Sequence, residues 1–135
     1  MDLIDSLMIS AAGLRVQGQR LRVISENVAN VDSVSERPGG DPYRRKTISF
    51  KNMLDRDAGL ELVTVDKFGS DPSDFGRKYD PSNPAADQTG YVKLPNVNAL
   101  IELADMREAQ RSYEANLKVI EVARSMLTRT IDLLR

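Results

Sequence analysis

The chain has 135 residues, of which 41% are hydrophobic and 29% charged, and this predicts one folded domain or a small domain with extensions. The net charge of −1 argues against a dedicated nucleic-acid binder, which usually has a basic surface. The absence of Cys and His excludes thiol nucleophiles, disulfides and Cys/His metal sites, and it removes the commonest general base.

The N-terminus, MDLIDSLMIS, lacks the basic region and the long apolar stretch of a Sec-type signal peptide. No apolar run approaches the ~20 residues that a membrane-spanning helix needs. We therefore expect a soluble chain without a membrane span, which stays in the cytosol unless another export route carries it.

Proline and glycine divide the chain into three parts. All six Pro residues and six of the eight Gly residues lie between positions 31 and 96. This pattern predicts two long helices around an irregular or β-rich insertion. We expect a mainly α fold, in which residues 1–32 and 97–135 form a coiled-coil-like helical core domain. Residues 33–96 would form loops and a small β-hairpin.

The first helix is predicted from about Leu3 to Ala29, with Asp2 as N-cap and Asp5 adding negative charge to the first turn. An apolar stripe recurs every seven residues, at Leu7, Leu14, Leu21 and Val28. A parallel series of small residues contains Ala11, Gly18 and Ser25. Because Gly in a helix interior costs about 1 kcal/mol relative to Ala, we expect Gly18 to lie in a seam where two helix backbones approach closely.

In the middle of the chain, strands are predicted within PYRRKTISF (42–50), over Gly59–Phe68 and at YVKL before Pro95. The stretch between Gly69 and Gly90 is interpreted as turns almost throughout. Its acidic residues do not match the spacing of a calcium-binding loop, so turn chemistry explains them better. The basic run Arg44–Lys46 is either a solvated strand face or a contact with an acidic neighbouring protein, and we do not expect it to bind nucleic acid.

The last helix is predicted to begin near Asn96 or Asn98 and to run almost to Arg135. Its apolar stripe contains Met106, Tyr113, Ile120, Leu127 and Leu134, and its small or short residues recur at Ala109, Asn116, Ala123 and Thr130. The two stripes would pack on each other as a helical hairpin. A two-helix hairpin leaves much of each stripe in contact with water, so we also expect burial against other copies or other chains.

Both ends resemble one family. SAAGLRVQGQRLRVISENVANVDS (10–33) resembles the N-terminal signature of bacterial flagellar axial proteins, in which a helix ends in Asn-x-x-Asn, here Asn27 and Asn30. RSYEANLKVIEVARSMLTRTIDLL (111–134), with Tyr113 and Asn116, is similar to their C-terminal signature. Within this family, PYRRKTISF and YDPSNPAADQTGYVKLPNVN are similar to segments of proximal rod members.

The resemblance implies a structural subunit without catalysis, cofactor or metal. It implies helical assembly with other copies of itself and other flagellar rod proteins into a hollow rod that crosses the periplasm and transmits motor torque. It also implies export through the flagellar type III apparatus without a cleaved signal peptide. The alternative is a soluble helical-hairpin adaptor that acts as a monomer or dimer. The residues expected at subunit interfaces are Leu3, Leu7, Ala11, Leu14, Gly18, Leu21, Asn27, Asn30, Tyr43, Arg44, Arg45, Tyr113, Asn116, Ile120 and Leu127.

Overall fold

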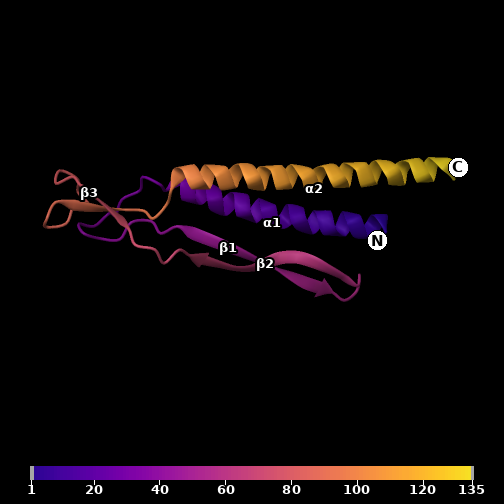
Figure 1. Ribbon diagram of the computed structural model, residues 1–135, viewed down its shortest axis with the longest axis horizontal. Helices are drawn as coiled ribbons and strands as arrows, with labels where there is room; N and C mark the ends of the chain where they lie inside the picture. Colours follow the sequence, from indigo (N-terminus) through magenta and orange to yellow (C-terminus); the bar gives the residue numbers. More distant parts are fainter. Residues whose placement is uncertain (1, 135) are drawn as a thin grey trace. The chain divides into compact units, whose positions relative to one another are not determined.

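The computed structural model describes residues 2–134, with two long helices and four strands in the order α1, β1, β2, β3, β4 and α2 (Figure 1). Helix α1 spans Leu3–Ala29 and helix α2 spans Ala99–Leu133. The strands form two separate two-stranded sheets, β1–β2 and β3–β4. The fold is mainly α with small β elements, as the sequence predicts. Within the described residues, neither helix combines the length and the apolar character that crossing a membrane requires.

Helix α1 begins and ends at polar groups supplied by its own flanks. Asp2 Oδ1 accepts a hydrogen bond from the Leu3 N–H at 2.5 Å, and the Asp5 carboxylate accepts one from the Asp2 N–H at 2.8 Å. At the other end, Asn30 Nδ2 donates to the carbonyl of Glu26 at 2.8 Å. These side chains satisfy backbone groups that have no partner inside the helix. The predicted bounds of this helix and its N-cap are confirmed.

Helix α2 begins at Ala99, directly after Asn98, which is one of its two predicted starts and caps the helix. Asn98 Oδ1 accepts from the Leu100 N–H at 3.0 Å, and the Asn98 carbonyl accepts from the Glu102 N–H, also at 3.0 Å. The helix then runs for 35 residues without Gly or Pro. The length of α2 therefore follows from its N-cap and from an uninterrupted run of residues that can adopt a helical backbone.

Strands β1 (Lys46–Asp55) and β2 (Leu60–Ser70) form a hairpin. Its turn places Gly59 at a φ of +67°, and the Gly59 N–H donates to the Asp55 carbonyl at 2.8 Å. Strand β1 begins later and ends later than predicted. The three residues before it, 43–45, lie outside the strand, and the Arg45 backbone bonds elsewhere: its N–H donates to Asn96 Oδ1 and its carbonyl accepts from the Asp71 N–H.

Strands β3 (Gly76–Tyr79) and β4 (Tyr91–Leu94) pair antiparallel, from Gly76 opposite Leu94 to Tyr79 opposite Tyr91. Strand β4 confirms the prediction at YVKL. The prediction of turns throughout 69–90 is wrong at β3, because pairing with a distant strand overrides the local turn preference. Between the strands, Asp87 Oδ1 accepts from the Thr89 hydroxyl at 2.6 Å, and this bond lowers the pKa of Asp87.

The chain folds into two compact units, each built from segments that are distant in the sequence. The first unit comprises the described parts of Met1–Leu21, Ile48–Lys67 and Arg107–Arg135. Its buried apolar residues are all small or medium-sized: Ala12, Val16, Ala109 and Ala123. The second unit comprises Arg22–Thr47 and Phe68–Met106. Its buried apolar residues are Val23, Ile24, Ala85 and Val92, and it also encloses Asn27 and Glu102.

Candidate functional site

A buried amide joins the last turn of α1 to two other segments of the second unit. Asn27 is 1% exposed. Its Nδ2 donates to the Lys46 carbonyl at 3.0 Å and to Glu102 Oε2 at 3.1 Å. Its Oδ1 accepts from the Lys46 N–H at 2.9 Å and from the Tyr43 hydroxyl at 2.8 Å. Both donors and both acceptor positions of the amide are therefore used inside the subunit.

A fully buried carboxylate lies beside this amide in the first turns of α2. Glu102 is 0% exposed, and its Oε1 accepts from Arg45 Nε at 2.5 Å. The Arg45 guanidinium also lies 3.8 Å from Asp71 and 3.9 Å from Asp105. A buried carboxylate is costly unless it is paired and hydrogen-bonded, and here it is both. We call Asn27, Tyr43, Arg45 and Glu102 the polar cluster; burial within it raises the pKa of Tyr43.

The other basic residues of this run also have partners in the same chain. Arg44 Nη1 donates to the carbonyls of Asp71 and Ser73, both at 2.9 Å, and its guanidinium lies 4.2 Å from the centroid of the Phe75 ring. The acids that meet this basic run belong to the same subunit. The run therefore has partners within its own chain, and its contact with an acidic neighbouring protein stays a prediction.

Lys46 completes the run, and its partner is an acid of α1. Lys46 Nζ lies 2.7 Å from Glu26 Oε2. The hydrogen bond between them lowers the pKa of Glu26 and raises that of Lys46. Both groups are on the surface, so this pair contributes little to stability.

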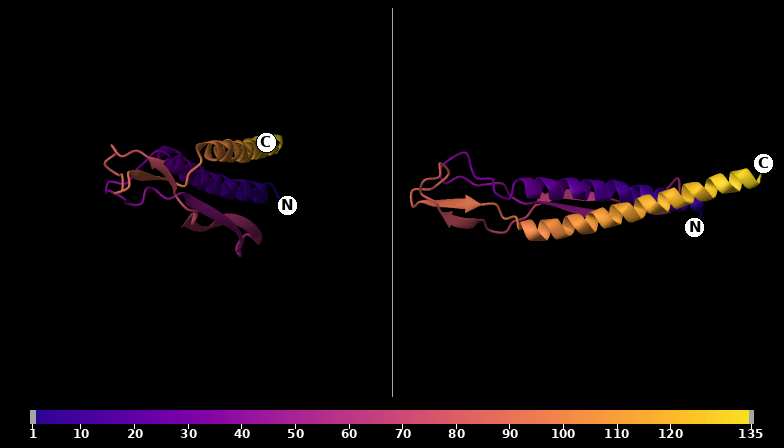
Figure 2. Two further views of the ribbon diagram at one scale, coloured as in Figure 1. Left: turned by 60° about the vertical axis from the view of Figure 1, so that its left-hand side comes forward. Right: turned by 90° about the horizontal axis from the view of Figure 1, so that it is seen from above.

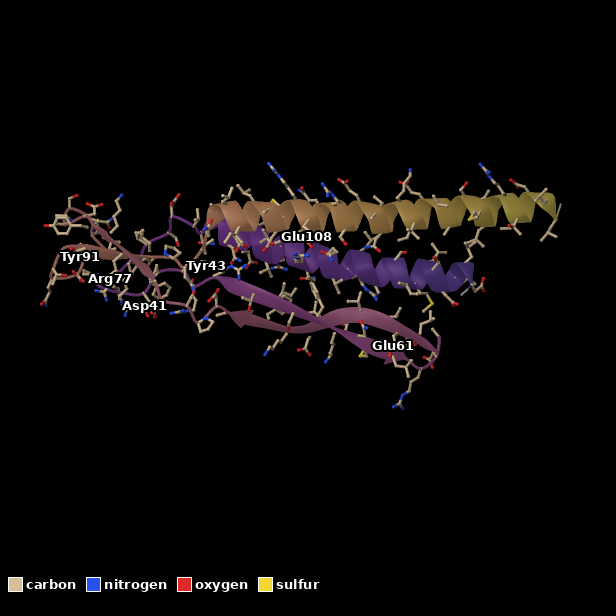
Figure 3. The ribbon with its side chains drawn as sticks, in the orientation of Figure 1. Asp41, Tyr43, Glu61, Arg77, Tyr91 and Glu108 are labelled. Carbon is tan, nitrogen blue, oxygen red and sulfur yellow. The ribbon has the colours of Figure 1, made fainter. Side chains whose placement is uncertain are left out.

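In the first unit, the two helices approach closely at Gly13. A Cβ on Gly13 would lie 2.8 Å from both Nδ2 and Oδ1 of Asn116, whereas nothing lies within 4 Å of the same position on Gly18. Two turns further along α1, Arg20 Nη2 lies 3.5 Å from Oε2 of Glu108, which Figure 3 labels beside α1. The close-packed glycine is therefore Gly13. The expected seam through Gly18 is not a contact between α1 and α2.

The predicted interface residues fall into three groups. The first group is half-buried and still exposes part of its apolar surface: Leu3, Leu7, Leu14, Leu21, Ile120 and Leu127. Ala11 and Tyr113 are exposed, and Gly18 is half-buried with open space beside its Cα. The polar members Asn27, Asn30, Tyr43, Arg44, Arg45 and Asn116 all make hydrogen bonds inside the chain. Sequence reasoning missed Glu102, which looks like an ordinary surface charge on a helix.

The face of α2 that carries the predicted stripe is only partly covered. Leu103 is 45% exposed, Leu117 42%, Ile131 62% and Leu134 84%. Together with the stripe residues they recur at spacings of three and four, as in a coiled-coil seam, except that the polar residues Gln110 and Arg124 interrupt the series. Exposed apolar surface in such a row marks a protein–protein interaction site. Within residues 2–134, no group of three or more acidic side chains is arranged to hold a metal ion.

Comparison with known proteins agrees with this picture of an assembly subunit. Residues 88–133 match the family model described as "Flagellar basal body rod FlgEFG protein C-terminal". The FlgC flagellar basal-body rod protein of Agrobacterium fabrum is 58% identical over 127 residues, which cover 94% of this chain and 91% of that protein. The FlgC proteins of Escherichia coli O6:H1 and Bacillus subtilis are 38% and 37% identical, covering 98% and 95% of each chain. Identity at this level across nearly the full length shows that the chain belongs to the FlgC family of flagellar basal-body rod proteins and is a structural subunit of that rod.

Proposed function

We propose that this rod subunit assembles helically with copies of itself and with other axial proteins in the proximal rod, and that the assembly transmits motor torque. The observation that carries the proposal is the uncovered row of apolar residues along α2. Leu117 and Ile131 stay exposed although their helix is paired with α1 over much of its length. Burial of such a row against neighbouring chains would supply hydrophobic free energy that the isolated subunit cannot gain.

In the assembled rod, the two termini would act as one helical core domain, residues 1–32 and 97–135, with residues 33–96 as an insertion. Coiled-coil-like packing would bring the half-buried leucines of α1 and the stripe of α2 against neighbours. The proposed interface combines Leu117 and Ile131 of the exposed row with Leu3, Leu7, Ala11, Leu14, Gly18, Leu21, Tyr113, Ile120 and Leu127. The polar cluster would instead hold each subunit in shape, because its side chains are bonded internally.

We also propose that the chain reaches the rod through the flagellar type III export apparatus without cleavage. The support is the chain's membership of a family of flagellar basal-body rod proteins. Mass spectrometry of the chain isolated from basal bodies would test this directly. An intact N-terminus agrees with uncleaved export, and a shortened one contradicts it.

Replacement in cells that lack their own FlgC protein tests the assembly proposal. The chain should restore motility and be found in purified basal bodies. Leu117→Asp should be exported but not incorporated, because an unpaired carboxylate in an apolar contact is costly. Leu100→Asp is the matched control, since Leu100 is 78% exposed and lies outside the proposed interface.

The result separates a rod subunit from the alternative adaptor. Normal incorporation of an exported Leu117→Asp chain would show that the α2 row is not an assembly surface. A wild-type chain that stays monomeric or dimeric in the cytosol would support the helical-hairpin adaptor instead.

A further inference from the structure

A groove in the first unit lies between α1 and the β1–β2 hairpin. Its volume is about 600 Å³, and it is lined by Val16 of α1 and by Met53, Leu62 and Val65 of the hairpin. Two charged residues also line it, Arg15 and Asp55. Neither of them forms an ion pair with another residue in the described part of the chain.

The end of α2 extends past the beginning of α1, as Figure 1 and the right-hand view of Figure 2 show. Leu3 and Ser6 of α1 lie beside the α2 segment from Lys118 to Met126, where they line a shallow pocket together. The residues after this segment, which we call the α2 extension (128–134), have no α1 residue beside them. The extension carries the most exposed aliphatic side chains of the described residues, among them Leu133 at 87% and Leu134 at 84%.

The α2 extension cannot occupy the groove of its own chain. Gly13 faces Asn116 and Arg20 lies beside Glu108, so the groove residue Val16 is level with about position 112 of α2. Ile131 lies ~28 Å further along the same continuous helix, at 1.5 Å per residue. An unbroken helix does not bend back over that distance, so any occupant of this kind must come from another chain.

We propose that the α2 extension of one copy docks in the α1–hairpin groove of a second copy. Beside its apolar side chains, the groove offers one cation and one anion that have no ion-pair partner among the described residues. Asp55 Oδ1 accepts from the backbone N–H groups of Asp57 and Ala58, and neither of these donors is charged. The extension offers Arg129 and Asp132, three residues apart on the same helix face, and Leu133 lies beside Arg129 on that face. Pairing Arg129 with Asp55 and Asp132 with Arg15 would match both charges while the Leu133 side chain enters the groove.

This contact joins two different surfaces, so each copy still offers a free extension and a free groove. Such a head-to-tail contact repeats and builds an open helical array rather than a closed dimer. A helix end of two turns buries less than the ~1,200 Å² of a stable interface, so one contact is weak and its strength comes from repetition. The inference rests on the proposed helical assembly and names one of its contacts.

Disulfide trapping tests the contact without background, because the chain contains no Cys. Thr64→Cys places a thiol in the groove, and Leu133→Cys places one on the docking face of the extension. The full-length double variant should be oxidised both in assembled basal bodies and as concentrated purified protein. We expect a ladder of dimers, trimers and larger products, whereas each single variant can form dimers at most. Glu61→Cys is the matched control on the same strand, exposed and outside the groove, and should give roughly tenfold less ladder with Leu133→Cys.

A ladder in either preparation supports docking. If neither preparation gives more ladder than the Glu61→Cys control, the proposal is overturned. A cross-link to a different rod protein in place of the ladder would show that the groove binds that protein, and it would also overturn the proposal that a second copy occupies the groove. Leu62→Cys with Leu133→Cys repeats the test if the first pair does not fold. Incorporation of the wild-type chain into basal bodies is scored separately. Incorporation without a ladder therefore rejects only the docking, while failure to incorporate rejects the proposed function.

Discussion

At the scale of single residues, the two glycines of α1 have different roles. Gly18 has open space beside it, so its cost to helix stability is not offset by any contact within the isolated subunit. Gly13 faces the amide of Asn116, whose Nδ2 donates to the Ser112 carbonyl at 2.9 Å. That bond restrains the amide, so a side chain at position 13 would have to displace a group that is already held.

We therefore expect opposite outcomes from two matched substitutions. Gly18→Ala should raise the free energy of unfolding by up to about 1 kcal/mol, the usual gain in a helix interior. Gly13→Ala gains the same propensity but overfills the helix contact, which typically costs 1–3 kcal/mol, so its net effect should be zero or destabilising. Urea unfolding followed by circular dichroism measures both. Equal stabilisation by the two would mean that Asn116 moves aside, and Gly13→Ala combined with Asn116→Ala should recover the missing gain.

At the scale of elements, the polar cluster ties the last turn of α1 and the start of β1 to the first turns of α2. Glu102→Ala would leave the Arg45 guanidinium and the Asn27 amide without their shared partner. Breaking a buried pair usually costs 3–5 kcal/mol. We expect about 3 kcal/mol here, because the Arg45 side chain keeps 25% of its surface in water.

Glu121→Ala is the matched control on the same helix. Its partner Lys118 lies 3.1 Å away, but both side chains are more than half exposed, so the loss should stay below about 1 kcal/mol. Urea unfolding of the full chain compares the two variants. Similar small losses for both would show that the cluster is not a stability determinant and that Arg45 finds other partners, such as Asp71 and Asp105.

The elements that sequence could predict are those whose signals are local. The caps at Asp2 and Asn98 stand beside the helices they start, so the helix bounds were predictable. Strand β3 was missed because its surroundings are rich in Pro, Asp and Gly, and its partner Leu94 lies 18 residues from Gly76. The polar cluster joins Arg45 to Glu102, 57 residues away, and no local pattern marks such a pair. Close packing of α1 on α2 was predicted at Gly18, but it occurs at Gly13. A helical wheel of one helix does not show which of its faces the partner helix covers.

At the scale of the whole molecule, the buried apolar side chains of the described residues are Ala and Val apart from Ile24, and the leucines remain accessible. In the first unit, the buried apolar residues of the described chain are Ala and Val, while Leu7, Leu14 and Leu21 stay half-buried. Helices draw most of their stability from packing of an apolar face rather than from propensity. The fold therefore leaves part of its helical stability to be gained in the assembled rod, and local stability should vary strongly along α2.

Hydrogen exchange along α2 should show this variation directly. In the isolated subunit, amides of the α2 extension, residues 128–134, should exchange nearly as fast as in an unfolded peptide, because their side chains pack on nothing within the chain. Amides of the first turns, near Glu102, should be protected, since the buried cluster must open before they exchange. In basal bodies the extension should gain protection as neighbouring subunits cover it, while the region of Glu102 changes little. Uniform protection along α2 in the free subunit would mean that the helix is stable without its neighbours, and an extension that stays unprotected in the rod would mean that no subunit contact covers it.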